Sequence, residues 1–265
     1  MITVEPVTPV APDSPTQQFY RDALRTLDEA KVPYVVGGGY AMAYYTGIQR
    51  NTKDLDIFMK PEDHERALAV LGEAGYRTEY FYPFWIAKAL SGEAFMDIIY
   101  NSGNGICRVD DEWINNAIPY EVLGYPTRLT PAEEQLWSKA FVMDRDRFDG
   151  GDVIHLILGR GHEMDWERLV RRFGGHERIL LAHLMLFGYV YPCDREKVPD
   201  WVVPRLQEAV KHESQPDSRL CRGGNLAHGG SYGTALRDWG YVDARLKPHG
   251  VLTQDQINQL PVPPY

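Results

Sequence analysis

Cysteine is scarce in this sequence, and the lack of a cysteine pattern argues against two classes of small domain. Cys107, Cys193 and Cys221 are far apart, and no CxxC pair is present. A disulfide framework requires an even set of cysteines, and a zinc knuckle requires paired ligands. We therefore expect three reduced thiols in a cytoplasmic protein.

Long apolar runs and paired histidines are also missing. No run of about 18 apolar residues occurs, so we expect no transmembrane helix. The N-terminus has no basic start followed by an apolar core, which argues against a secretory signal and for an extended arm over residues 1–15. The 8 histidines form no HxH or HxxxH pair. His155 and His183 lie among apolar residues, where we expect core histidines rather than metal ligands.

The charge balance is acidic and uneven. The chain of 265 residues has a formal net charge of −9, which argues against a general nucleic-acid coat protein. Residues 1–130 carry 11 basic and 18 acidic side chains, whereas residues 131–265 carry 17 and 19. A local anion site in the second, nearly neutral part remains compatible with this distribution.

The pattern of apolar and turn-forming residues predicts a mixed α/β part at the N-terminal end. Phe19, Leu24 and Leu27 have helical spacing, and Pro61 and Gly75 frame another helix. Short runs rich in β-branched and aromatic residues indicate strands. The expected helices cover 16–30, 40–46 and 61–76, and the expected strands cover 34–36, 55–59, 77–81, 85–90 and 93–100.

From Thr130 onward the spacing becomes helical. Thr130 and Glu133 have the spacing of a capping box, and further helices are expected over 165–173, 176–189 and 204–212. We therefore predict an α+β protein with three parts: the arm over 1–15, a domain with a small mixed sheet and flanking helices over 16–128, and a mainly helical domain over 129–265. The glycine-rich stretch 222–233 is expected to be a loop without an assigned role.

Two aspartates on one strand are the first candidate for chemistry. Side chains alternate along a strand, so Asp54 and Asp56 share one face while Leu55 and Ile57 share the other. Two ionised carboxylates so close repel each other unless a cation lies between them. Mg²⁺, a hard cation with oxygen ligands, is the simplest occupant, and Mn²⁺ could replace it. A solvated surface pair is the ordinary alternative for a lone DxD.

Asp97 is the candidate third carboxylate. It lies inside the apolar strand FMDIIY, where an unpaired aspartate would be costly to bury. It could cap a turn or pair with an arginine; alternatively, it could lie on the strand next to Asp54 and Asp56. Three carboxylates can hold two metal ions, which is the arrangement used for displacement at phosphorus.

Three glycines connect a short strand to a helix. Backbone N–H groups at a helix N-terminus can bind phosphate, so Gly38 and Gly39 are candidates for a triphosphate cradle. The run is not a dinucleotide fingerprint, because GxGxxG is absent. It is not a Walker loop either, because no GK[ST] follows.

Together these residues resemble the signature of the polymerase-β-like nucleotidyltransferase superfamily. The resemblance is greatest to the bacterial minimal nucleotidyltransferases and to the toxin-type branch of type IV toxin–antitoxin systems. Those families combine a Gly-Gly or Gly-Ser turn, a downstream DxD and a third carboxylate on a later strand. The matching positions here are Gly38, Gly39, Ala41, Gly47, Arg50, Thr52, Asp54, Asp56 and Asp97.

The resemblance implies a nucleotidyltransferase fold and a role for each matching residue. Asp54 and Asp56 would bind both metals, and Asp97 would complete the site and help to deprotonate the acceptor hydroxyl. Arg50 and Thr52 would orient phosphate or the loop before Asp54, with a surface salt bridge as the alternative for Arg50. Many relatives have serine where this chain has Gly39, so a hydroxyl contact to phosphate would be missing.

A second segment also resembles the toxin-type enzymes. Lys139, Arg145, Asp149 and Asp152 follow the pattern K-x5-R-x3-D-x2-D. On a continuous helix, Lys139 would lie about three turns from Asp149 and would not pair with it directly. Lys139 is expected to contact the triphosphate, and Asp149 could orient it from a following turn; the alternative is a solvated face. Arg168, Arg171 and Arg172 are expected to be surface residues, or an acceptor site.

These observations favour a Mg²⁺-dependent transferase that moves an NMP from an NTP, such as ATP, to a hydroxyl acceptor and releases pyrophosphate. A protein hydroxyl, a tRNA 3′ end and a small molecule are all admissible acceptors, and an antitoxin is a candidate partner. The alternative is a non-catalytic nucleotide-sensing protein, which the intact Asp54, Asp56 and Asp97 disfavour. A metal-dependent hydrolase of another kind would need histidine ligands at a suitable spacing.

Overall fold

The computed structural model describes residues 14–50, 52, 54–216, 218–226 and 231–260. It divides into two compact units: Met1–Tyr100 with Val109–Pro131, and Asn101–Arg108 with Ala132–Tyr265. Residues 1–13 of the expected arm lie outside the described residues. Ser14 and Pro15, the last two residues of that arm, instead begin the first helix.

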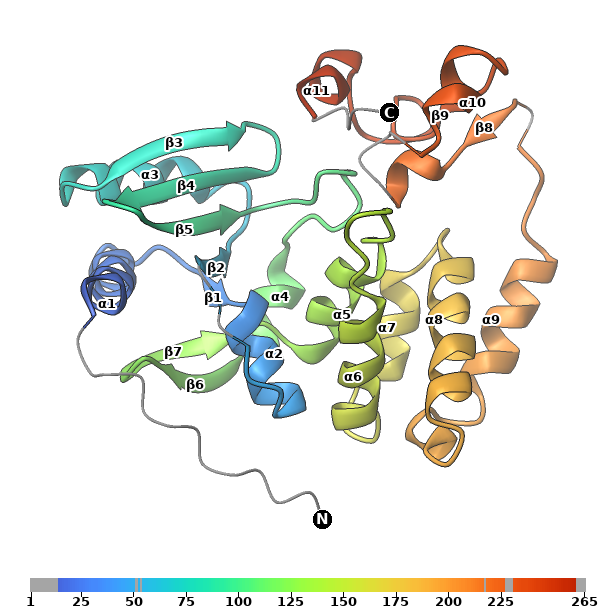
Figure 1. Ribbon diagram of the computed structural model, residues 1–265, viewed down its shortest axis with the longest axis horizontal. Helices are drawn as coiled ribbons and strands as arrows, with labels where there is room; N and C mark the ends of the chain where they lie inside the picture. Colours follow the sequence, from blue (N-terminus) through green and yellow to red (C-terminus); the bar gives the residue numbers. More distant parts are fainter. Residues whose placement is uncertain (1–13, 51, 53, 217, 227–230, 261–265) are drawn as a thin grey trace. The chain divides into compact units, whose positions relative to one another are not determined.

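The first unit is built on a mixed seven-stranded sheet with the order β3-β4-β5-β2-β1-β7-β6 (Figure 1). β2 pairs with β5 in parallel, whereas β1 pairs with β2 and β4 pairs with β5 antiparallel. The strands are β1 (Val35–Val36), β2 (Asp54–Phe58), β3 (Arg77–Tyr82), β4 (Ile86–Ser91), β5 (Ala94–Ile99), β6 (Ile118–Val122) and β7 (Tyr125–Leu129).

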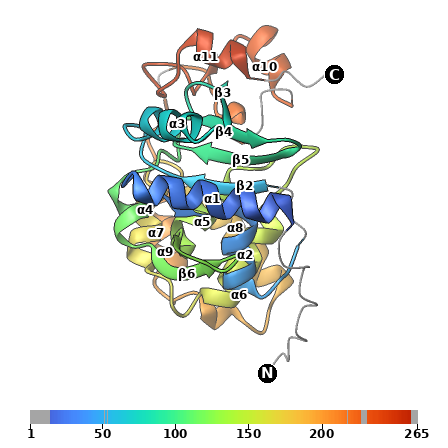
Figure 2. The same cartoon turned by 90° about the vertical axis from the view of Figure 1, so that its left-hand side faces the viewer.

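Four helices accompany this sheet: α1 (Pro15–Glu29), α2 (Gly38–Thr46), α3 (His64–Glu73) and α4 (Asp111–Asn115). The Ser14 side chain accepts the N–H of Gln17 at 3.2 Å, and proline occupies the first position of α1, so both local signals fix its start. Figure 2 shows α1 along its length, and it packs against α3 and β5. α3 also packs against β3, so the two helices bury apolar residues of the sheet.

Alternation along β2 and β5 separates a packed face from a polar one. Leu55, Ile57, Met96 and Ile98 are fully buried. Asp54, Asp56 and Asp97 point to the opposite face and are half-buried. Packing of the apolar set against the helices fixes the orientation of both strands, because a slip by one residue would exchange the faces.

The structure differs from expectation at several places in the first unit. Residues 118–129 form a hairpin of β6 and β7 that the sequence did not predict. α2 begins at Gly38, two residues before the expected start, and ends as expected at Gly47 in the left-handed conformation. The expected strands around residues 34–36, 55–59, 77–81, 85–90 and 93–100 are confirmed to within a few residues at their ends.

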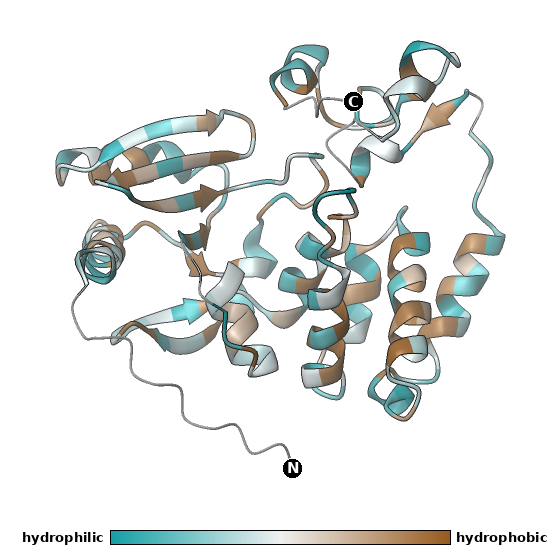
Figure 3. Ribbon diagram, viewed as in Figure 1, coloured by the Kyte–Doolittle hydropathy of each residue, from teal (hydrophilic) through white to brown (hydrophobic). Residues whose placement is uncertain are grey.

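The second unit is mainly helical. Its longer helices are α5 (Ala132–Ala140), α6 (Gly150–Arg160), α7 (Trp166–Arg172), α8 (Glu177–Val190) and α9 (Val202–Lys211), followed by α10 (Gly233–Arg237) and α11 (Gln254–Gln259). Short turns η1 (Arg195–Lys197) and η2 (Gly223–Asn225) and a strand pair, β8 (Leu220–Cys221) and β9 (Val242–Asp243), complete it. Figure 3 shows apolar residues concentrated on α6 and α8, which pack against each other, and α6 also packs against α5 and α8 against α9. His183 is buried as expected, 1% exposed.

The expected surface position of Arg168 in the second unit was wrong. Arg168 is not a surface residue: it is 8% exposed, and its guanidinium lies 2.6 Å from the Glu133 carboxylate. The same carboxylate accepts the backbone N–H of Asp165 at 2.6 Å. Glu133 therefore joins α5 to α7, and the capping box that its spacing with Thr130 suggested stays a prediction.

Across the described residues, the helices are too short or too polar to traverse a lipid bilayer.

Candidate functional site

The two strands β2 and β5 bring three carboxylates together. Their parallel register pairs Asp56 with Asp97, and Asp54 lies two residues earlier on the same face. One carboxylate oxygen from each aspartate lies within 4.8 Å of the other two. The predicted contact of Asp97 with Asp54 and Asp56 is therefore present. Three half-buried carboxylates offer only oxygen ligands, which is the donor set that Mg²⁺ and Mn²⁺ prefer.

Gly38 lies directly against this cluster. A Cβ atom on Gly38 would be only 1.7 Å from Oδ2 of Asp56, and the residue has a φ of +54°. The N–H of Gly37 donates to the backbone oxygen of Asp56 at 2.9 Å. Glycine at position 38 thus lets the start of α2 approach the Asp56 carboxylate closely. This contact also holds the helix N-terminus and its backbone N–H groups beside the acidic cluster.

Thr52 orients the first carboxylate. Its hydroxyl lies 2.7 Å from Oδ1 of Asp54 and 3.0 Å from the Asp54 backbone oxygen. A side chain at Gly39 would meet Thr52 Cβ at 3.1 Å, so glycine there leaves room for the threonine. A serine at position 39 would crowd Thr52. Arg50 is exposed in the connection before β2, and its role stays a prediction.

Lys88 is a site residue that we did not predict from the sequence. It lies opposite Asp97 in the β4–β5 register, and its ammonium is 2.6 Å from Oδ1 of Asp97. The sequence carried a usable signal, because Lys88 stands between the apolar Ala87 and Ala89 in the expected strand over 85–90. Period-2 alternation therefore assigns it to the polar face. The alternative that Asp97 pairs with an arginine was wrong in the residue type, because its partner is Lys88.

Burial and two neighbouring charges shift the pKa of the Asp97 carboxyl, with a net rise. Its burial raises the pKa above the ordinary value, the Lys88 ammonium lowers it, and the neighbouring Asp54 carboxylate raises it. Tyr40, in the first turn of α2, also has a raised pKa because it is buried and lies near Asp54. Both shifts follow from a concentration of negative charge in a partly desolvated site.

Lys139 belongs to the second unit, where it pairs with the two aspartates of its segment. Its ammonium lies 3.1 Å from Asp149 and 2.8 Å from Asp152, and all three side chains are less than one-fifth exposed. The expectation that Lys139 and Asp149 cannot pair was wrong, because α5 ends at Ala140 and the chain turns back before α6. Contact of Lys139 with a triphosphate stays a prediction.

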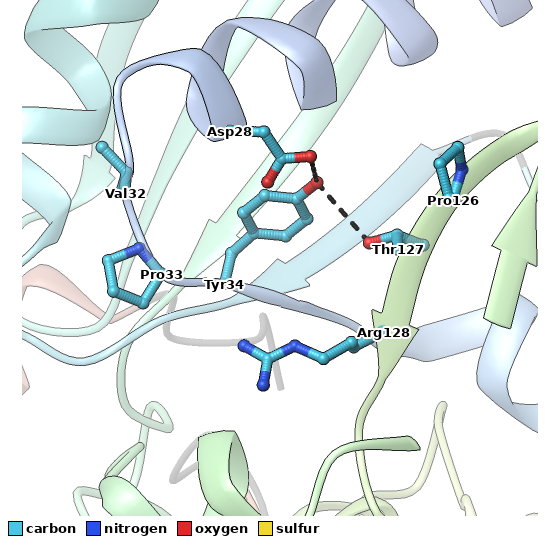
Figure 4. Close-up of a pocket in the computed structure, with 7 residues that line it drawn as sticks. All are labelled: Asp28, Val32, Pro33, Tyr34, Pro126, Thr127 and Arg128. Atoms are coloured by element: carbon cyan, nitrogen blue, oxygen red, sulfur yellow. Dashed lines mark hydrogen bonds between the residues drawn. The ribbon is translucent and has the colours of Figure 1, made fainter. Parts of the chain in front are cut away.

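A separate pocket opens at the start of β1, whereas the glycines follow its end. The cavity measures about 310 Å³ and is lined by Asp28, Val32, Pro33, Tyr34, Pro126, Thr127 and Arg128 (Figure 4). The Tyr34 hydroxyl donates to Asp28 at 3.2 Å and accepts from Thr127 at 3.5 Å. Since it contains no predicted site residue, we assign it no part in the chemistry below.

Comparison with known families identifies the chain. A family model described as "Uncharacterised nucleotidyltransferase" matches residues 17–187, which is more than half of the sequence. The chain belongs to this nucleotidyltransferase family. The match spans the glycines, all three aspartates and Lys88, and it confirms the resemblance to the polymerase-β-like superfamily. Among curated proteins, no sequence matches the chain.

Several solved structures are similar to this family member at low identity. The lincosamide antibiotic adenylyltransferase LnuA, lincomycin-bound, has 19% identity over 54% of this chain and 96% of its own, with a TM-score of 0.38. ANT(2")-Ia in complex with adenylyl-2"-tobramycin has 18% identity over 67% and 99%, with a TM-score of 0.42. JHP933 from Helicobacter pylori has 13% identity over 75% and 96%, with a TM-score of 0.34. At such low values these likenesses say nothing about what this chain acts on.

Proposed function

We propose that this protein transfers a nucleoside monophosphate from an NTP, such as ATP, to a hydroxyl acceptor in the cytoplasm and releases pyrophosphate. The observation that carries the proposal is the cluster of Asp54, Asp56 and Asp97, with ligand atoms within 4.8 Å of one another, in a chain of a nucleotidyltransferase family. The Gly38 approach adds a helix N-terminus beside that cluster.

Each residue has a task in this proposal. Asp54, Asp56 and Asp97 would hold Mg²⁺ or Mn²⁺, and Thr52 would keep the Asp54 carboxylate oriented through its 2.7 Å hydrogen bond. When bound there, a divalent cation supplies neutralisation of phosphate charge and lowers the pKa of a coordinated hydroxyl. Asp97 would accept the proton of the acceptor hydroxyl, for which its pKa raised by burial makes it a better base.

The glycine turn and the basic residues would position the nucleotide. The backbone N–H groups of Gly38 and Gly39 at the start of α2 are suited to phosphate oxygens. Arg50 and Lys139 would contact the triphosphate. The acceptor can be a protein hydroxyl, a tRNA 3′ end or a small molecule, and an antitoxin partner would be sought by co-purification.

Transfer of label from a panel of α-³²P-NTPs in a lysate tests the proposal. We expect Mg²⁺-dependent labelling of an acceptor that is lost in Asp54→Ala and Asp56→Ala. Asp111→Ala is the matched control, because that carboxylate belongs to the same unit and is 75% exposed. Labelling that survives both substitutions would rule out this site. Binding of NTP without any transfer would favour the nucleotide-sensing alternative.

A further inference from the structure

Lys88 places an ammonium group within the acidic cluster. The ammonium lies 2.6 Å from Oδ1 of Asp97, and the two side chains are only 16% and 13% exposed. Fully buried alanines on either side fix the orientation of its strand. The Lys88 side chain is therefore part of the site and not an exposed lysine near it.

Two aromatic rings hold the ammonium in place. It lies 4.1 Å from the ring centroid of Phe95 and 5.0 Å from that of Phe81. Phe95 and Asp97 are two residues apart on β5, so they present their side chains to the same face as Lys88. A cation over aromatic faces is stabilised without leaving its carboxylate partner. These contacts keep the ammonium at one oxygen of the third candidate ligand.

The charge of Lys88 affects how strongly the three aspartates can bind a metal ion. Asp54, Asp56 and Asp97 contribute three negative charges, and Lys88 neutralises one of them locally. A metal ion that uses the same Asp97 oxygen must displace the ammonium and then remain near a like charge. If the ammonium only held the Asp97 side chain in position, its removal would weaken metal binding, because Asp97 would then be a badly oriented ligand. If the ammonium competes with the metal, its removal strengthens metal binding.

We propose that Lys88 competes with divalent cations for the Asp97 carboxylate. While no nucleotide is bound, its ammonium therefore weakens the binding of free divalent cations to the cluster. The proposal rests on the proposed function in its choice of Asp54, Asp56 and Asp97 as metal ligands. On arrival of an NTP, the triphosphate offers Lys88 a new anionic partner. Asp97 is then released to act as a ligand and as the base. Lys88 thereby couples occupation of the cluster to binding of the nucleotide.

Mn²⁺ binding without nucleotide, followed by electron paramagnetic resonance or calorimetry, tests this role. We expect Lys88→Met to tighten Mn²⁺ binding by roughly tenfold or more, because nearby charges interact strongly in a partly desolvated site. Lys88→Arg, which keeps the charge, should remain within about threefold of the unmodified protein by the same reasoning. Unchanged or weaker binding in Lys88→Met overturns the proposal.

Two further variants make the result specific. Lys60→Met removes the same charge from the first unit at a residue that lies beyond the end of β2 and pairs with Asp111 at 3.0 Å. It should leave Mn²⁺ binding unchanged. If Lys88→Met does not fold, as judged by thermal unfolding, Lys88→Gln replaces it with the same expectation.

The test separates this inference from the proposed function. If Asp54→Asn abolishes the tightened binding in the Lys88→Met protein, the metal occupies the aspartate cluster; if binding persists, Lys88 does not compete there and the inference fails. Tightened binding in a protein that transfers no label would support the role of Lys88 and contradict the transferase. Transfer of label by the unmodified protein, together with unchanged Mn²⁺ affinity in Lys88→Met, would support the transferase and contradict the role of Lys88.

Discussion

Substitution of Gly38 by alanine is the sharpest test of the site geometry. The added Cβ would lie 1.7 Å from Oδ2, 2.6 Å from Cγ and 2.9 Å from Cβ of Asp56. Three atoms of one carboxylate side chain are therefore in conflict with a single methyl group. The backbone is also unsuitable, because Gly38 has a φ of +54°, where L-residues are strained.

The expected magnitude has two parts. The left-handed backbone costs about 1–2 kcal/mol for a residue with a Cβ. Real Cβ atoms essentially never approach closer than 3.0 Å, so the 1.7 Å contact requires a shift of at least 1.3 Å between α2 and the Asp56 carboxylate. Misplacement of a reacting group by about 1 Å can lower the rate on the order of 100-fold. We therefore expect Gly38→Ala to retain less than about 1% of the transfer activity by that estimate.

Gly92→Ala isolates the backbone part of this effect. Gly92 has a φ of +59°, and no atom lies within 4 Å of the position that its added methyl group would take, so the variant carries the same conformational strain without the collision. It should lose about 1–2 kcal/mol of stability and keep its transfer activity. The assays are urea unfolding and initial rates of label transfer. Equal activity of the two variants would refute the close approach of Gly38 to Asp56.

Three further predictions concern charged and hydroxyl groups. Glu134 is fully buried, and its burial raises the pKa to about 7 from 4.5 despite the neighbouring Arg168 and Arg172. The folded state therefore binds more protons than the unfolded state between these values, and stability should fall as pH rises from 4.5 to 7 by at most about 3 kcal/mol. Urea unfolding of Glu134→Gln should show a shallower fall, and an unchanged slope would contradict the assignment. Lys139→Met leaves two partly buried carboxylates without their ammonium and should cost about 2–4 kcal/mol of stability. Lys211→Met, at a side chain 70% exposed, should stay within about 0.5 kcal/mol in the same unfolding assay. Thr52→Val removes the hydrogen bond to Asp54 and should lower kcat roughly tenfold with little change in the KM for NTP, since a hydrogen bond to a charged group contributes about 1.5–3 kcal/mol. A raised KM at constant kcat would instead assign Thr52 to nucleotide binding.

The candidate ligands could be predicted because their signals are local. Two aspartates separated by one residue share a strand face, and Asp97 stands in an apolar run where it needs a partner. The glycine run before a helix is equally local. Packing of Leu55 and Ile57 on the other face then fixes which side of the strand becomes the site.

What the sequence did not predict depends on distant partners. The pairing of Lys88 with Asp97 requires the β4–β5 register, and the pairing of Lys139 with Asp149 requires the turn after Ala140. The burial of Arg168 depends on Glu133, a residue of another helix. None of these contacts changes the local pattern of apolar and charged residues that sequence reasoning uses.

The hairpin of β6 and β7 was missed for a different reason. Pro119 and Pro126 stand inside its strands, and proline ordinarily argues against a strand. Pro119 lies on β6, an edge of the sheet, where a missing N–H is tolerated, whereas Pro126 lies on β7, the next strand. Its turn uses Leu123 and Gly124 with φ values of 54° and 77°, so the usual Asn-Gly signal of a tight hairpin is replaced by a leucine in a left-handed conformation.

The parallel pairing of β2 with β5 has a consequence for insertions and deletions. Asp54 and Asp56 lie on one strand and Asp97 on the other, so the cluster exists in one alignment of the two strands. One residue added within β5 before Asp97 would turn that carboxylate toward the apolar side and a buried residue toward the cluster. The same addition between α3 and β3 leaves the alignment intact. Length variation among functional relatives should therefore be confined to the connections, while the number of residues within these two strands stays constant.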